Sequence, residues 1–264
     1  MHILFDAMGV QVQVQEATDD RLTTWWGSLM DLGYTTSISD YKQPLVSIKP
    51  PSSQLDGVDV LVILTRQWIH ETNIPKDTCF SFTRFGLQVA ELAGIQSWVQ
   101  NGGGLLLFTN HSYTTAEGGP YFPVHDIQLA GAFGISLHFT YFNPPAGAAT
   151  LSMTPNPNAP PELIDGVATV EAWDSGGIVP FNGSSTYGTV IFPLPAGATD
   201  DGGLGYSPVD HAFGVLYQYG KGRIIVLGHS GIAGNKGTPF PSPGQIGAAD
   251  NLRFLNNCVK FLGS

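Results

Sequence analysis

A nearly continuous apolar run at residues 58–64, Val-Asp-Val-Leu-Val-Ile-Leu, restricts the fold of this chain more than any other segment. A run of this length with a single polar residue predicts a β-strand that is covered on both faces. Shorter runs of the same kind occur at residues 3–5, 105–108 and 223–227. Since strands covered on both faces belong to sheets flanked by helices, the pattern predicts an α/β fold.

Helical patterns alternate with these runs. Residues 82–99 place apolar side chains at three- and four-residue spacing, and residues 250–262 repeat that spacing. Thr18-Asp19-Asp20 offers N-caps to a helix that Gly33 ends, and Asp250 offers one to the last helix. Strands alternating with helices predict a doubly wound, mostly parallel open sheet of the flavodoxin-like kind, with right-handed crossovers.

The chain is expected to form one domain over residues 1–264. A Pro-, Gly- and Asn-rich region at about 143–205 reads as a loop-rich insertion packed on the sheet. Residues 213–219 and 223–227 flank Gly220-Lys221-Gly222, which is the spacing of a hairpin.

Composition excludes several classes of protein. The chain has 21 acidic and 11 basic residues and a net charge of −10, which argues against nucleic-acid binding. It has no secretory signal and no apolar run long enough to span a membrane, so we expect a soluble protein without a membrane partner, cytoplasmic rather than secreted. The two cysteines, Cys79 and Cys258, cannot form a disulfide framework and are expected to be inert thiols.

Residues 222–231 include the last apolar run and the turn that follows it. This segment superficially matches the nucleophile elbow of a serine hydrolase. Here Gly228-His229-Ser230-Gly231 is followed by Ile232, where the elbow requires a small residue. The catalytic histidine of that fold follows the serine, but no histidine follows His229. The elbow hypothesis therefore fails.

Several segments together resemble the class I glutamine amidotransferase-like superfamily, in the branch that includes trehalose-utilisation and gliding-motility-type domains. The resemblance rests on the order and spacing of six segments, which lie at residues 55–62, 95–107, 132–135, 163–167, 219–228 and 250–255. It implies a nucleophilic cysteine directly after the strand that ends at Phe108, but Thr109-Asn110-His111-Ser112 follows instead. Glutaminase activity is therefore not expected, and many relatives in this branch look like non-catalytic modules.

Polar side chains follow the predicted strands and should meet at the carboxyl edge of the sheet. As catalytic residues we expect His111 or His229 as general base, Ser112 or Ser230 as nucleophile, and Asp6 as the group that orients the imidazole. The predicted substrate-binding residues are Asn110, Arg66, Thr65 and Tyr113. As a weaker alternative, Asp6, His111 and His229 hold a divalent metal; no other cofactor is expected.

Two functions remain open at this point. The first is hydrolysis of an ester, amide, lactone or glycosidic substrate by this cluster, with a water or a serine as nucleophile. The second is a non-catalytic module that binds a carbohydrate or a protein partner through exposed aromatic side chains. Each polar residue also has a structural interpretation, because Asp6, His229 and Ser230 are residue types that satisfy backbone groups in tight turns.

Overall fold

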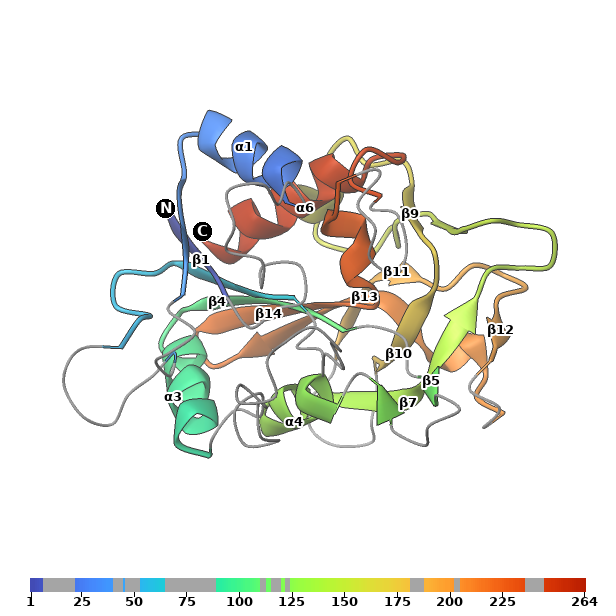
Figure 1. The fold of residues 1–264 in the computed structure, drawn as a ribbon, viewed down its shortest axis with the longest axis horizontal. Coiled ribbons are helices and arrows are strands. Elements are labelled where there is room, and N and C mark those ends of the chain that lie inside the picture. The colour runs from blue at the N-terminus through green and yellow to red at the C-terminus, as the bar shows by residue number, and fades with distance from the viewer. Residues whose placement is uncertain are drawn as a thin grey trace, which may run out of the picture.

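The computed structural model describes residues 1–6, 22–39, 45, 53–64, 89–109, 113–114, 120–121, 124–180, 188–201, 205–235 and 245–264. Within these residues, ten strands form one mixed sheet in the order β12-β7-β10-β13-β14-β4-β3-β1-β2, with β11 paired to β13. Figure 1 shows the sheet in the middle of the molecule, with helices above and below it.

One half of the sheet is parallel. Its strands are β2 (Thr35–Ile38), β1 (His2–Phe5), β3 (Val60–Ile63), β4 (Gly104–Phe108) and β14 (Gly222–Leu227). Every residue of β3 and β4 is buried, which confirms that these short apolar runs are covered on both faces.

The other half of the sheet is antiparallel. Its strands are β7 (Ser136–Asn143), β10 (Ser175–Val179), β11 (Thr189–Pro193), β12 (Thr199–Asp200) and β13 (Ala212–Tyr219). The hairpin expected around Gly220 is confirmed as β13 and β14. The expectation of a mostly parallel sheet is wrong for this half, because β10, β11 and β12 come from the loop-rich region and pair antiparallel. That region therefore supplies strands to the main sheet instead of only covering it.

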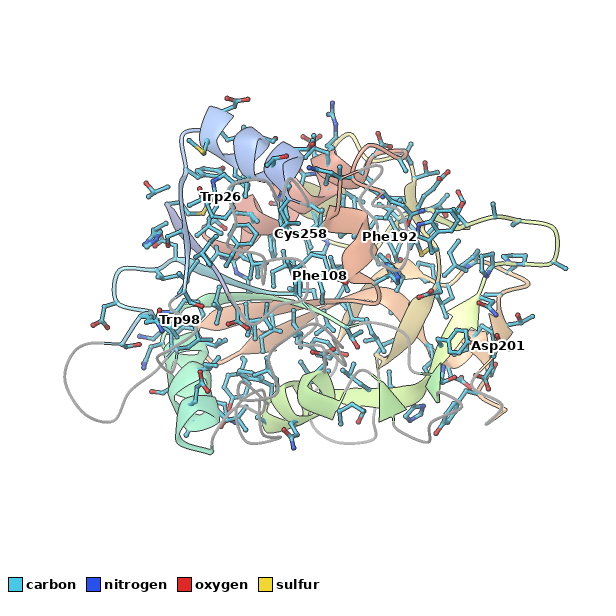
Figure 2. The ribbon with its side chains drawn as sticks, in the orientation of Figure 1. Trp26, Trp98, Phe108, Phe192, Asp201 and Cys258 are labelled. Carbon is cyan, nitrogen blue, oxygen red and sulfur yellow. The ribbon has the colours of Figure 1, made fainter. Side chains whose placement is uncertain are left out.

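Helices cover both faces of the sheet. On one face lie α1 (Thr23–Asp31) and α6 (Asn251–Leu262), and on the other lie α3 (Val89–Gln100) and α4 (Val124–Ala132). Each face has its own apolar core. Figure 2 shows Phe108, Phe192 and Cys258 in the core between the sheet and α6. Burial raises the pKa of the Cys258 thiol, which agrees with an inert thiol; Cys79 lies outside the described residues.

The remaining elements are short. They are β5 (Tyr113–Thr114), β6 (Pro120–Tyr121), β8 (Leu151–Met153), β9 (Val170–Ala172), α5 (Pro161–Ile164) and the 3₁₀ turns η2 (Pro208–Asp210) and η3 (Ser230–Ala233). Strands β5 and β6 form one separate two-stranded sheet, and β8 and β9 form another. No helix in the described residues is both long and apolar enough to cross a membrane.

The predicted helix caps need correction. Helix α1 begins at Thr23 with Leu22 in the N-cap position, and the expected caps Thr18-Asp19-Asp20 lie outside the described residues. Asp250 does occupy the N-cap position of α6, but its carboxylate accepts hydrogen bonds from the backbone N–H groups of Ala168 and Thr169 at 2.8 and 3.2 Å. That carboxylate ties a distant loop to the helix instead of capping the helix itself.

Candidate functional site

The carboxyl ends of the parallel strands meet at one edge of the sheet. The Asp6 N–H, after β1, donates to the carbonyl oxygen of Val62 at 2.9 Å, and the Thr109 N–H, after β4, donates to that of Leu227 at 2.8 Å. His229 and Ser230 follow β14 at the same edge. Three of the predicted catalytic residues, Asp6, His229 and Ser230, thus share this edge.

The other predicted site residues have no described side chain. Thr65, Arg66, Asn110, His111 and Ser112 lie outside the described residues. Tyr113 begins β5, but only its backbone is described. Their roles stay predictions.

His229 makes two contacts that involve both of its ring nitrogens. Its Nδ1 accepts a hydrogen bond from the backbone N–H of Gly231 at 2.9 Å. Its Nε2 lies 3.4 Å from Oδ1 of Asp174. Because Nδ1 accepts, the proton of the neutral ring sits on Nε2 and faces the carboxylate.

The turn around His229 depends on two glycines. A Cβ added at Gly231 would lie 2.5 Å from Cε1 of His229, so a larger residue would displace the imidazole. A Cβ added at Gly228 would lie 2.2 Å from Oγ of Ser175. Between them, the two glycines let the ring and the neighbouring strand approach the end of β14 closely.

Asp174 reaches this edge because β10 runs antiparallel to the strands of the other half. The N–H of Gly176 donates to the carbonyl oxygen of Gly228 at 2.8 Å, which fixes the start of β10 beside the end of β14. The Asp174 side chain is 14% exposed, whereas that of His229 is 2% exposed. The carboxylate is therefore the more accessible member of the pair.

Sequence reasoning did not identify Asp174. Its only sequence signal is an acidic residue before the small-residue strand Ser175-Gly176-Gly177, and that strand was taken for part of a loop-rich insertion. The sequence predicted β13 as the neighbour of β14, but not that β10 pairs with β13 on its far side.

Asp6 is buried at the same edge. Its side chain is 1% exposed, and the Ser39 hydroxyl lies 3.5 Å from its Oδ1, at the long limit of a hydrogen bond. Among the described residues, no three His, Cys, Asp or Glu side chains are grouped closely enough to hold a metal ion. Because His111 is outside that set, the metal alternative with Asp6, His111 and His229 stays a prediction.

A second polar cluster lies on the antiparallel half and was not predicted. His138 on β7 and His211 before β13 form a hydrogen bond of 2.9 Å between Nδ1 of His138 and Nε2 of His211. His211 Nδ1 donates to the carbonyl oxygen of Ser207 at 2.8 Å, so its Nε2 must accept from His138 in the neutral pair. The Tyr206 ring stacks on His138 at 4.3 Å.

Acidic side chains border this cluster. Asp200 accepts hydrogen bonds from the Thr140 hydroxyl and from the Tyr206 N–H, and Asp201 accepts from Tyr141 and Asn143. Burial, the hydrogen bond to Asp201 and the negative charges of Asp201 and Asp174 raise the pKa of Tyr141 to about 12. In Figure 2, Asp201 lies at the outer end of the sheet, away from α6.

The histidine pair predicts a loss of stability in acid. Burial, and then the charge of His211, lower the pKa of His138 below its ordinary value of 6.5. The folded protein therefore takes up this proton less readily than the unfolded chain does, so the free energy of unfolding falls as the pH drops below about 6.5. Urea midpoints of the wild type and of His138→Gln, measured between about pH 7.5 and 5, should show a smaller acid dependence in the variant. Parallel curves for the two proteins would contradict this assignment.

Comparisons with solved structures agree with this fold. A cytoplasmic protein from Salmonella typhimurium LT2 superposes with a TM-score of 0.57 at 14% identity, over 99% of both chains. A ThuA-like protein from Parabacteroides merdae superposes with a TM-score of 0.51 at 9% identity, over 100% of this chain and 89% of the other. The chain has a ThuA-like fold.

The same fold also occurs inside a longer chain. The cold-adapted β-galactosidase of Rahnella sp. R3 superposes over 98% of this chain but only 30% of its own length, with a TM-score of 0.50 and 13% identity. No protein-family model and no curated protein sequence matches this chain. At these identities the comparisons establish the ThuA-like fold alone.

Proposed function

We propose that this ThuA-like chain belongs to the cysteine-lacking branch of the amidotransferase-like superfamily. We further propose that it hydrolyses a small ester, amide, lactone or glycosidic substrate at the carboxyl edge of the sheet. In this proposal Asp174, held by His229, activates the attacking water. The observation that carries the proposal is the contact of 3.4 Å between Nε2 of His229 and Oδ1 of Asp174 at the edge where Asp6 also lies.

The contacts of His229 favour a positioning role over that of a general base. Its Nδ1 is occupied by the Gly231 N–H, and its Nε2 is directed to Asp174. A nearly buried imidazole in this state faces the carboxylate through Nε2 and limits the orientations that the carboxylate can adopt. The more exposed Asp174 is then the group that can meet a substrate.

The proposed chemistry needs no cysteine. Asp174 accepts a proton from a water molecule, whose oxygen attacks the carbonyl or anomeric carbon of the substrate. The protonated carboxyl then returns the proton to the leaving group as the scissile bond breaks, which restores the carboxylate. Thr65, Arg66, Asn110 and Tyr113 remain the proposed substrate contacts, and His111 and Ser112 remain candidate catalytic residues.

Activity screening tests this proposal. Purified wild type would be assayed with chromogenic esters, lactones, anilides and glycosides, alongside Asp174→Asn, His229→Gln and the control Asp165→Asn. Asp165 is an exposed carboxylate after α5. We expect Asp174→Asn to lower kcat by a factor of about 10² to 10⁴, because general acid–base catalysis contributes a rate enhancement of this size. We expect His229→Gln to lower kcat by a smaller factor. Full activity of Asp174→Asn would overturn the proposal.

The second candidate function is a non-catalytic binding module. It is favoured by the engagement of both His229 nitrogens, which leaves this imidazole in contact with protein groups. This candidate predicts no turnover by the wild type with any substrate class. It also predicts saturable binding of a sugar or protein ligand that Asp174→Asn weakens without abolishing the fold.

A further inference from the structure

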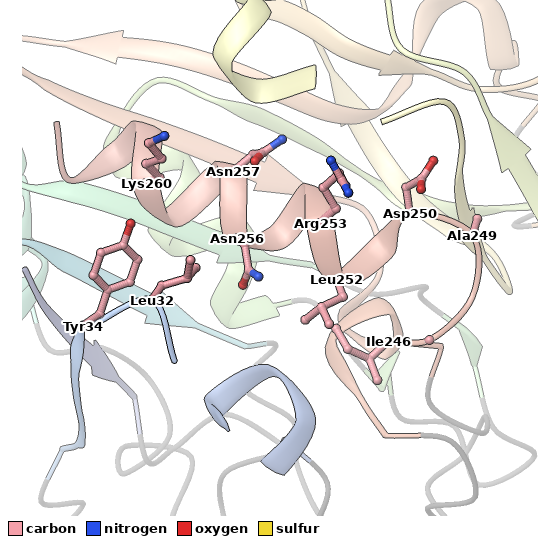
Figure 3. Close-up of a pocket in the computed structure, with 11 residues that line it drawn as sticks. Leu32, Tyr34, Ile246, Ala249, Asp250, Leu252, Arg253, Asn256, Asn257 and Lys260 are labelled. Atoms are coloured by element: carbon pink, nitrogen blue, oxygen red, sulfur yellow. The ribbon is translucent and has the colours of Figure 1, made fainter. Parts of the chain in front are cut away.

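A groove of about 660 Å³ lies along the outer side of α6, and none of the strand-end residues Asp6, Asp174, His229 and Ser230 lines it. Figure 3 shows its lining, with α6 along one side and Leu32, Tyr34 and Ile246 facing it from other segments. Its volume falls within the range of small-molecule sites, which is roughly 300 to 1,000 Å³. The groove is therefore large enough for an organic ligand and much larger than a single inorganic ion.

The helix presents a polar stripe to this groove. Arg253, Asn256, Asn257 and Lys260 all line it. Their spacing places them on one face of α6. Arg253 and Lys260 are seven residues apart, which corresponds to roughly 10 Å along the helix axis. The groove thus has a positive charge toward each end.

Both positively charged side chains are exposed. Within the described part of the chain, neither Arg253 nor Lys260 has a carboxylate oxygen within 4.0 Å of its side-chain nitrogens. The carboxylate of the groove, Asp250, is engaged by the backbone N–H groups of Ala168 and Thr169. Those hydrogen bonds, and more weakly the charge of Arg253, lower the pKa of Asp250. This is a locally cationic groove in a chain with a net charge of −10.

The other residues that line the groove suit the uncharged, apolar part of a ligand. Leu32 and Leu252 contribute apolar surface, and the Leu32 side chain is 52% exposed. Tyr34 adds an aromatic ring with a hydroxyl group. An exposed leucine beside a tyrosine can cover methylene groups between two charged ends.

We propose that this groove binds a small organic dianion whose two carboxylate or phosphate groups lie at opposite ends of an apolar body. One anionic group pairs with Arg253 and the other with Lys260, and the body lies against Leu32 and Leu252. This binding is separate from the proposed hydrolysis, because none of the groove residues belongs to the strand-end cluster.

Binding of defined dicarboxylates tests the proposal. The two carboxylates of azelate are about as far apart as the two cations, whereas succinate is too short to reach both cations. Nonanoate has an apolar chain of the same length as azelate but only one carboxylate. Titrations followed by ¹H–¹⁵N spectra of the full chain should show saturable shifts of α6 amides with azelate, and weaker binding of the other two acids. Arg253→Gln and Lys260→Gln should each weaken azelate binding about three- to fivefold, which is the scale of an exposed ion pair.

Lys221→Gln is the matched control, because Lys221 is an exposed cation in the turn between β13 and β14. It should leave azelate affinity unchanged. All three variants replace exposed side chains, and unchanged thermal midpoints would show that they fold. The proposal is overturned if azelate shows no saturation below about 50 mM. Equal affinity for azelate and nonanoate, or wild-type affinity of the Arg253→Gln/Lys260→Gln double variant, would overturn it as well.

Discussion

Replacing Gly222 by alanine is expected to destabilise the protein by about 3 kcal/mol or more, because the new methyl group has no space. A Cβ at this position would lie 2.1 Å from the carbonyl oxygen of Val99 and 2.4 Å from that of Gly103. Both are backbone atoms, at the end of α3 and in the turn that follows it. Relief would require β14 to move away from the helix and thereby strain its pairing with β4.

Gly131→Ala provides the matched control for this variant. Gly131 lies in α4, and a Cβ there would meet nothing within 4 Å. Alanine is the better helix former, so Gly131→Ala should raise the free energy of unfolding by about 0.5 to 1 kcal/mol. Urea denaturation of both variants measures the difference. A Gly222→Ala protein as stable as wild type would show that the end of α3 yields easily.

Asn251→Ala is expected to cost about 3 kcal/mol, because it leaves three backbone groups, one buried and two partly buried, without a partner. The Asn251 side chain is fully buried and bonds to the N–H of Glu171 at 2.9 Å, the carbonyl of Glu171 at 2.8 Å and the carbonyl of Gln245 at 2.7 Å. It therefore links the start of α6 to β9 and to the preceding loop. The alanine variant lacks this amide group, which forms hydrogen bonds with backbone groups of two separate segments.

Asn257→Ala tests whether that cost depends on burial. Asn257 is on the same helix and also donates to two backbone carbonyls, those of Leu163 at 3.3 Å and Asp165 at 3.0 Å, but its second contact is solvent-exposed. Water can replace such bonds, so this variant should lose about 1 kcal/mol or less. Calorimetric unfolding would compare the two. Equal losses would mean that the three bonds of Asn251 contribute no more than exposed ones.

The parallel half of the fold was readable from the sequence because its signals are local. The apolar runs that became β3 and β4 contain nearly all the information needed to identify a strand covered on both faces. The hairpin around Gly220 was readable for the same reason, since its turn and both strands are contiguous. Gly33, with a φ of 79°, ends α1 as predicted, because glycine adopts this conformation easily.

The antiparallel half was not readable, because its pairings are not local. Strand β10 is Ser-Gly-Gly-Ile-Val, and two glycines in five residues indicate a loop more than a strand. Glycine is required at position 177 because a side chain there would meet Thr140 and the backbone of His138 on β7. That requirement is invisible until the two strands are side by side.

The sequence predicted which edge of the sheet carries the candidate site, but it did not predict all the residues that form the site. Asp6, His229 and Ser230 follow strands whose parallel order brings their ends together, so their shared edge followed from the α/β pattern. Asp174 arrives from the antiparallel side, and the hydrogen bond from Gly231 to His229 depends on a turn geometry that no motif encodes. The sequence alone therefore could not identify Asp174 as the partner of His229.

The late position of β14 in the chain also has a consequence for how the chain folds. Strand β4 is bordered on one side by β3, an early neighbour, and on the other by β14, which is the last strand within the described residues. Long-range pairing of this kind slows folding, and during synthesis β4 leaves the ribosome well before its partner. Until β14 arrives, β4 is an unpaired apolar edge of the kind that associates with other chains. A nascent or truncated chain lacking β14 is therefore the form of this protein most prone to aggregation.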